Sequence, residues 1–119
     1  MFVGIVRQCK VKEYEENGRI PYREWIENLR VTDRKAAAVI DSRINRVRTG
    51  NLGAHKGVGE GVQELVIDHG QGFRVYFAED GKELVILLGG GSKRTQPADI
   101  EKAKFHWRKY KETKNAKKK

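Results

Sequence analysis

Cysteine and long apolar runs are scarce in this sequence, and each absence excludes a class of protein. Cys9 is the single cysteine among 119 residues, which excludes an internal disulfide framework and a cysteine-based zinc site. No apolar run approaches the roughly 18 residues that a membrane-spanning helix needs. The first residues also lack the pattern of a secretory signal. We therefore expect a cytoplasmic protein without a membrane partner.

Proline is rare as well, and the composition favours a folded domain. Of the 119 residues, 38% are hydrophobic and 34% are charged, and only two are proline. Such a chain has enough apolar side chains to form a core and does not belong to the disordered class. Chains divide into separate cores only well beyond this length. We expect one domain over residues 1–112, followed by a basic, disordered tail over residues 113–119.

Acidic residues are scarce only in the last quarter of the chain. Residues 1–88 contain 14 Lys and Arg against 13 Asp and Glu, whereas residues 89–119 contain 11 against 3. The formal net charge of +9 therefore lies almost wholly near the C-terminus. Such a directional field favours a polyanionic partner such as nucleic acid, or an acidic protein partner. For the extreme terminus, a solvated basic tail is the alternative.

Hydrophobic periodicity predicts an α+β domain with one sheet and helices packed on it. β-Branched residues favour a first strand over residues 2–11. Two amphipathic helices follow, the first beginning at Pro21 and the second having Thr32 as its N-cap and ending at residues 49–51. Residues 52–61 are rich in glycine and small residues, which predicts a mobile loop.

The middle of the chain has the pattern of an antiparallel meander. Three strand-like runs are separated by links of hairpin length: residues 62–67, 73–78 and 83–88. The pair Asp80-Gly81 is typical of a type I′ turn. The third run is apolar after its first residue, which favours an interior strand covered on both faces. A glycine run is expected to leave that strand, and a third helix to begin at Pro97.

The motifs for nucleotides and metals are incomplete. Glycines within residues 57–61 are not followed by a helix pattern, and the glycine run at 89–91 lacks the spacing of a phosphate loop. The three histidines, His55, His69 and His106, lie far apart without the cysteine or carboxylate spacing of a metal site. We expect neither a cofactor nor a metal.

A basic residue on the middle strand is the first candidate for binding a phosphate. The pleat places Arg74 and Tyr76 on the face opposite to their apolar neighbours. The length of the preceding link would set Glu64 diagonal to Arg74 on the adjacent strand. This predicts either a cross-strand ion pair with only a structural role, or an arginine that a carboxylate orients towards a phosphate.

The segment from residue 89 to 96 is the second candidate. Glycine N–H groups, the positive end of the third helix and the side chains of Lys93 and Arg94 would together attract an anion. A corner-turning loop with a solvated basic pair is the alternative. The glycine-rich loop is long enough for His55 and Lys56 to cover the same site.

Several blocks of the sequence resemble the RelE/ParE toxin superfamily, in particular its HigB-like branch of addiction-module killer proteins. The most specific blocks are GFRVYF at residues 72–77 and GGSKRTQ at residues 90–96, and the likeness extends over about residues 2–110. It implies this order of elements and a toxin that a small helix-turn-helix antitoxin neutralises. Most members are endoribonucleases acting on ribosome-bound mRNA, whereas the ParE branch inhibits DNA gyrase.

Cleavage by such ribonucleases uses the 2′-hydroxyl of the RNA as nucleophile, so the protein must orient the strand, stabilise added negative charge and move protons. By resemblance, Arg74, Lys93 and Arg94 would be the catalytic residues, with Glu64 orienting Arg74. The expected RNA contacts are Lys56, His55, Arg48, Tyr76 and Gln96. The sequence departs from the family pattern at the general-acid position, which Ile100 occupies. A non-enzymatic inhibitor of gyrase or another protein is therefore the alternative.

Overall fold

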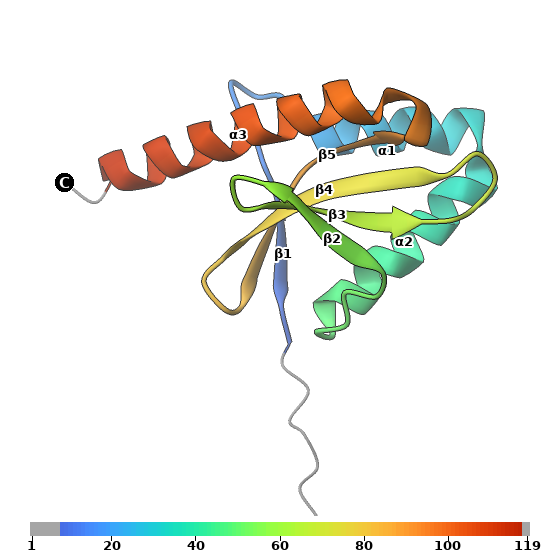
Figure 1. Ribbon diagram of the computed structural model, residues 1–119, viewed down its shortest axis with the longest axis horizontal. Coiled ribbons are helices and arrows are strands. Elements are labelled where there is room, and N and C mark those ends of the chain that lie inside the picture. The colour runs from blue at the N-terminus through green and yellow to red at the C-terminus, as the bar shows by residue number, and fades with distance from the viewer. Residues whose placement is uncertain (1–7, 118–119) are drawn as a thin grey trace, which may run out of the picture.

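Five strands form one mixed sheet, with α1 and α2 packed on one face and α3 on the other (Figure 1). The computed structural model describes residues 8–117. The strands are β1 (Lys10–Glu13), β2 (His55–Gly59), β3 (Val62–Ile67), β4 (Phe73–Asp80) and β5 (Leu84–Ser92). The helices are α1 (Pro21–Thr32), α2 (Arg34–Arg48) and α3 (Gln96–Lys117), with a 3-10 turn, η1 (Lys93–Thr95), before α3. The predicted α+β class is confirmed.

The strand order is β1-β5-β4-β3-β2, with β1 parallel to β5 and every other pair antiparallel. β5 is therefore an interior strand, as its apolar run predicts. Its pleat sends Val85 and Leu87 into the core beneath α1 and α2, and Ile86 and Leu88 into the core beneath α3. Two apolar cores, one on each face, hold the helices on the sheet.

β5 is longer than its sequence predicts. The glycines at 89–91 continue the ladder with β4 as far as Ser92, past a bulge opposite Tyr76 and Phe77. The prediction that the glycine run leaves the strand is wrong, because these residues stay paired with β4. β1 lies closer to the C-terminus than predicted. It covers Lys10–Glu13 instead of residues 2–11, and residues 1–7 lie outside the described part of the chain.

The glycine-rich segment before β3 is a strand and not the predicted loop. β2 pairs with β3, and the two are joined by Glu60 and Gly61, which both have positive φ, 58° and 86°. That is the backbone of a type I′ turn. The predicted type I′ turn at Asp80-Gly81 does not form, since only Gly81 there has a positive φ and residues 81–83 make a three-residue link.

The N-cap of α2 is Asp33, one residue after the predicted cap. Thr32 is the last residue of α1, and the carboxylate of Asp33 accepts a hydrogen bond from the N–H of Ala36 at 3.2 Å. The same residue ends α1 through its N–H, which donates to the carbonyl of Leu29. Asp33 thus forms the corner between two helices that pack against each other.

Replacing Asp33 with alanine is expected to lower the free energy of unfolding by about 1 kcal/mol, because the N–H of Ala36 loses its acceptor. Urea unfolding followed by circular dichroism measures the change. Thr32→Ala is the matched control, since the Thr32 hydroxyl bonds only the carbonyl of Asn28 on the exposed surface. Equal losses in the two variants would contradict the capping role.

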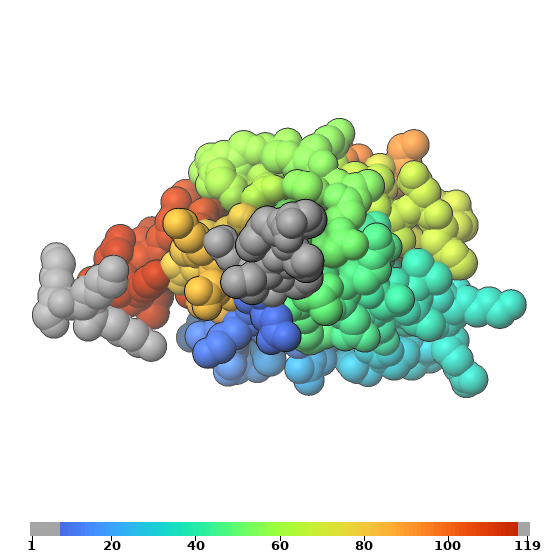
Figure 2. All heavy atoms as spheres, turned by 90° about the horizontal axis from the view of Figure 1, so that it is seen from below, coloured from blue at the N-terminus to red at the C-terminus, as the bar shows by residue number. Residues whose placement is uncertain are grey.

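α3 packs on the sheet through its first half and extends past it at its C-terminal end (Figures 1 and 2). Ala103 and Trp107 are buried, as their spacing predicts. The prediction of a disordered tail is wrong for residues 113–117, which are helical, and Lys114 pairs with Asp80 of β4 at 2.5 Å. Across residues 8–117, no helix is both long and apolar enough to cross a membrane.

Candidate functional site: a buried carboxylate among cations

The carboxylate of Glu64 is the centre of a polar cluster between β3 and the start of α3. Its side chain is fully buried. The amide of Gln96, the first residue of α3, donates to both carboxylate oxygens, at 3.0 and 2.9 Å. Lys56 of β2 lies 3.6 Å from one oxygen, and Nε of Arg74 lies 3.8 Å from the same oxygen. Side chains from four elements therefore meet at one acidic group.

Sheet register explains why these side chains meet. Lys56 is directly opposite Glu64, which is opposite Tyr76, and Arg74 is opposite Val66. Side chains at directly opposed and diagonal positions share a face. The predicted diagonal ion pair between Glu64 and Arg74 is confirmed. We refer to Glu64, Lys56, Arg74 and Gln96 together as the Glu64 cluster.

Arg74 is held more tightly than a surface arginine. One terminal nitrogen donates to the carbonyl of Phe73 at 3.0 Å, and only 10% of the side chain is exposed. Its Nε is buried without a hydrogen-bond partner. A side chain at Gly72 would touch both the Arg74 guanidinium and Lys93, whose N–H donates to the Gly72 carbonyl. Arg74 and Lys93 thus flank one glycine, and Lys93 is the exposed member of the pair.

Tyr76 is not available as an RNA contact. Its side chain is fully buried beneath α3, and its hydroxyl has no hydrogen-bond partner. Burial raises the pKa of this hydroxyl well above its usual range, and the charges of Glu64 and Asp99 act in the same direction. The hydroxyl therefore stays protonated beside the Glu64 cluster, and the predicted contact of Tyr76 with RNA is corrected to a position within the core.

The predicted anion site at the start of α3 contains the protein's own carboxylate. Asp99 accepts a hydrogen bond from the Thr95 hydroxyl at 2.5 Å and lies against Gly91. An aspartate in the first turn satisfies the positive end of the helix. What remains open at this corner is the pair Lys93 and Arg94, both exposed on η1.

Two predicted RNA contacts lie away from the Glu64 cluster. His55 precedes Lys56 on β2 and is opposite Leu65, so the alternation of the strand directs it to the other face, where its ring contacts the Gly53 carbonyl. Arg48 ends α2 and donates to Asn45 at 2.7 Å, on the opposite layer of the domain. Neither side chain joins Arg74 and Lys93. The sequence does not predict the position of His55, because residues 52–61 are predicted to be a loop, and a loop has no strand face to which the side chain can be assigned.

The sequence gives no signal for one structural arginine. Arg43 lies on α2, and its guanidinium donates to three carbonyls, those of Val66, Leu52 and Ala54. Burial lowers its pKa. Arg43 thereby fastens the chain entering β2 to the end of β3. Because these acceptors are backbone atoms on distant segments, no residue pattern identifies them.

The geometry defines a small α+β domain with a mixed sheet and a cationic corner built around one buried glutamate. No family model matches the sequence. A protein of Haemophilus influenzae (strain Rd), described as uncharacterized, is 45% identical over 86 residues, which is 72% of this chain and 85% of the relative. The chain belongs to the same family as that protein. Within residues 8–117, no three His, Cys, Asp or Glu side chains are placed to hold a metal ion.

Proposed function

We propose that this protein is the toxin of a type II toxin–antitoxin module of the RelE/ParE superfamily, HigB-like branch, and that it cleaves ribosome-bound mRNA in the cytoplasm. The observation that supports this most is the convergence of Lys56 and Arg74 on buried Glu64, with Lys93 next to Arg74 beside Gly72. Lys56 lies on β2, Arg74 on β4 and Lys93 on η1, and these three elements are far apart in the sequence. A small antitoxin of the helix-turn-helix type is the expected protein partner.

The exposed cations at this corner suit a phosphodiester backbone. Lys56, Lys93 and Arg94 are all exposed, and the Arg74 guanidinium and Lys93 both lie beside Gly72. Phosphate contacts of this kind position a strand without reading its sequence. A guanidinium held by Glu64 and by the Phe73 carbonyl is preorganised, so it would stabilise the charge that develops on the phosphate without having to reorganise.

The proposed reaction is an internal transesterification. The 2′-oxygen attacks the neighbouring phosphorus, the bond to the 5′-oxygen breaks, and a 2′,3′-cyclic phosphate and a 5′-hydroxyl result. Glu64 is the group in the cluster able to accept the 2′-hydroxyl proton, and Lys56 is the group able to donate to the leaving 5′-oxygen. Because Gln96 bonds both Glu64 oxygens, its amide must move before Glu64 can accept that proton.

Inducing the protein without an antitoxin and mapping transcript ends by primer extension tests this function. We expect discrete new ends in ribosome-bound mRNA. In Arg94→Ala their rate of formation should fall about a hundredfold, since one well-placed donor contributes this much to catalysis. Lys35→Ala, an exposed cation on α2, is the matched control and should leave the ends unchanged. Intact transcripts during growth arrest would contradict cleavage.

One observation favours a second candidate, a non-enzymatic inhibitor of DNA gyrase or another protein. Glu64 is fully buried and Arg74 is 8% exposed, so the strongest candidates for chemistry are already bonded within the domain. In that case induction would give intact mRNA together with DNA-damage signalling. The same primer-extension experiment separates the two functions.

A further inference from the structure

Gln96 is fixed at both ends, which sets the direction of its side-chain amide. Its backbone N–H donates to the carbonyl of Lys93 and closes the turn η1. Its side-chain nitrogen donates to both oxygens of buried Glu64, at 3.0 and 2.9 Å. A carboxylate only accepts hydrogen bonds, so the nitrogen of the amide and not its oxygen must face Glu64. The side-chain oxygen of Gln96 is therefore directed away from that carboxylate.

The Gln96 oxygen is an acceptor among side chains that can only donate. Lysine and arginine side chains carry no acceptor, and Lys56, Lys93 and Arg94 are all exposed at this corner. Gln96 is itself partly exposed, and no donor within residues 8–117 bonds its side-chain oxygen. A ligand that these cations hold by its negative charge can therefore donate a hydrogen bond to this oxygen.

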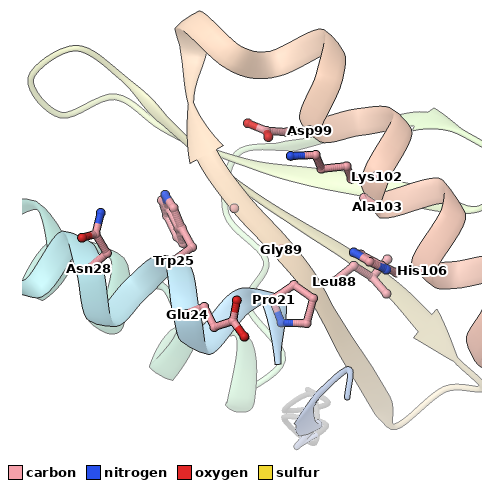
Figure 3. A pocket seen from close by; sticks show the side chains of 11 residues that line it. Pro21, Glu24, Trp25, Asn28, Leu88, Gly89, Asp99, Lys102, Ala103 and His106 are labelled. Carbon is pink, nitrogen blue, oxygen red and sulfur yellow. The ribbon is translucent and has the colours of Figure 1, made fainter. Parts of the chain in front are cut away.

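The carboxylate in the first turn of α3 does not compete for this ligand. Asp99 accepts a hydrogen bond from the Thr95 hydroxyl at 2.5 Å and reaches from α3 towards β5 (Figure 3). There it lines a hollow of about 330 Å³ between α1 and α3, together with a second carboxylate, Glu24, and one lysine, Lys102. That hollow has no excess of positive charge, so a phosphate backbone is attracted to the corner at η1 instead.

The corner suits the backbone of a nucleic acid and not its bases. Proteins hold unpaired bases by stacking them on exposed aromatic rings, but Tyr76, the aromatic side chain beside the Glu64 cluster, is fully buried. Within residues 8–117 the exposed large apolar side chains are Val31, across the sheet on α1, and Phe105, about 13 Å along α3 from Gln96. The donor nearest to a bound phosphate is then the 2′-hydroxyl of the adjoining ribose, a group that DNA lacks.

We propose that the side-chain oxygen of Gln96 accepts a hydrogen bond from a ribose 2′-hydroxyl of a strand whose phosphates lie against Lys93 and Arg94, so that Gln96 selects RNA over DNA. Glu64 is a positioning residue for this contact, because its carboxylate determines which end of the amide faces the ligand. The bond belongs to the bound state, before the amide moves as the proposed reaction requires. The inference rests on the proposed function and adds to it the group that distinguishes the sugar.

Binding of matched oligonucleotides to the full-length protein tests the proposal. The probes are short fluorescent oligo(U) and oligo(dU), which carry the same base and differ at the 2′-position, and fluorescence anisotropy measures their affinities at one salt concentration. We expect oligo(U) to bind about five- to tenfold more tightly, as expected for one hydrogen bond. Oligo(U) with 2′-fluoro groups keeps the sugar conformation of RNA without the 2′-donor, and should bind as weakly as oligo(dU). Equal affinities for all three probes would overturn the proposal.

Two variants show whether Gln96 is the source of the preference. Gln96→Ala should abolish it, so that oligo(U) and oligo(dU) bind equally. Gln63→Ala makes the same change on β3, where strand alternation directs residue 63 to the face opposite to Glu64, and should keep the full preference. The ratio of the two affinities is insensitive to a partly unfolded fraction, because both probes need the folded protein. A preference that persists in Gln96→Ala would overturn the proposal.

The same measurements separate this inference from the proposed function. Loss of the preference in Gln96→Ala together with intact transcripts after induction supports the 2′-hydroxyl contact and contradicts cleavage. Discrete transcript ends with an unchanged preference in Gln96→Ala support cleavage and overturn the contact. A preference for oligo(A) over oligo(U) that disappears in Gln96→Ala would overturn the ribose contact in favour of a base contact. Binding of neither oligo(U) nor oligo(dU) would overturn both the contact and the nucleic-acid site.

Discussion

Replacing Glu64 with alanine is expected to lower the free energy of unfolding by about 3–5 kcal/mol, the range found when one partner of a buried ion pair is removed. Glu64 is fully buried and is the carboxylate beside the largely buried Arg74. Without it, the guanidinium loses its nearby negative charge, and the Gln96 amide loses both acceptors. Chemical denaturation measures the change.

Two further variants show whether burial is the reason for this loss. Glu60→Ala removes the acidic partner of an exposed ion pair on the same hairpin, 2.6 Å from Arg108, and should cost less than about 1 kcal/mol. Replacing Glu64 and Arg74 together by leucine should recover much of the stability lost in Glu64→Ala, because no unpaired charge remains buried. A Glu64→Ala loss no larger than that of Glu60→Ala would show that the cluster contributes little to stability.

Replacing Gly90 with alanine is expected to destabilise the domain by about 3 kcal/mol, at the upper end of the range for overpacking. The new methyl group would overlap the indole ring of Trp25. That ring is rigid and lies between α1 and β5, so relief requires the helix to move away from the sheet. Thermal unfolding followed by circular dichroism measures the effect.

Gly57→Ala is the control for the Gly90 prediction. Gly57 also lies in a strand, but nothing stands within 4 Å of the added methyl group and its φ is not positive. Its substitution should change the free energy of unfolding by less than about 0.5 kcal/mol. Combining Gly90→Ala with Trp25→Ala should restore part of the loss if the indole is the obstacle. Equal stability of the two glycine variants would contradict the account.

The elements that the sequence predicts well are those with a strong local period. β3, β4 and the apolar part of β5 follow from alternating residues and hairpin-length links, and α1 begins at Pro21 as its position in the chain predicts. Register then places Glu64 diagonal to Arg74 without any knowledge of the helices. These predictions depend only on neighbours along the chain or across one hairpin.

The predictions that failed depend on distant segments. Tyr76 is buried because α3 returns over β4, and Asp99 occupies the start of α3 because Gly91 leaves space for it. The contact of Gln96 with Glu64 spans 32 positions in the sequence. The local propensity of the glycines in β2 and β5 predicts a loop. The pairing of each strand with its neighbour overrides that preference.

Crosslinking of RNA to the protein tests the central claim most directly. A short single-stranded RNA containing 4-thiouridine is irradiated with the full-length protein, and the crosslinked peptides are identified by mass spectrometry. The account predicts crosslinks within β2 around Lys56 and within residues 93–96, and their loss when Lys93 and Arg94 are both replaced by alanine. Crosslinks confined to α2, or an unchanged pattern in that double variant, would contradict a nucleic-acid site at the Glu64 cluster.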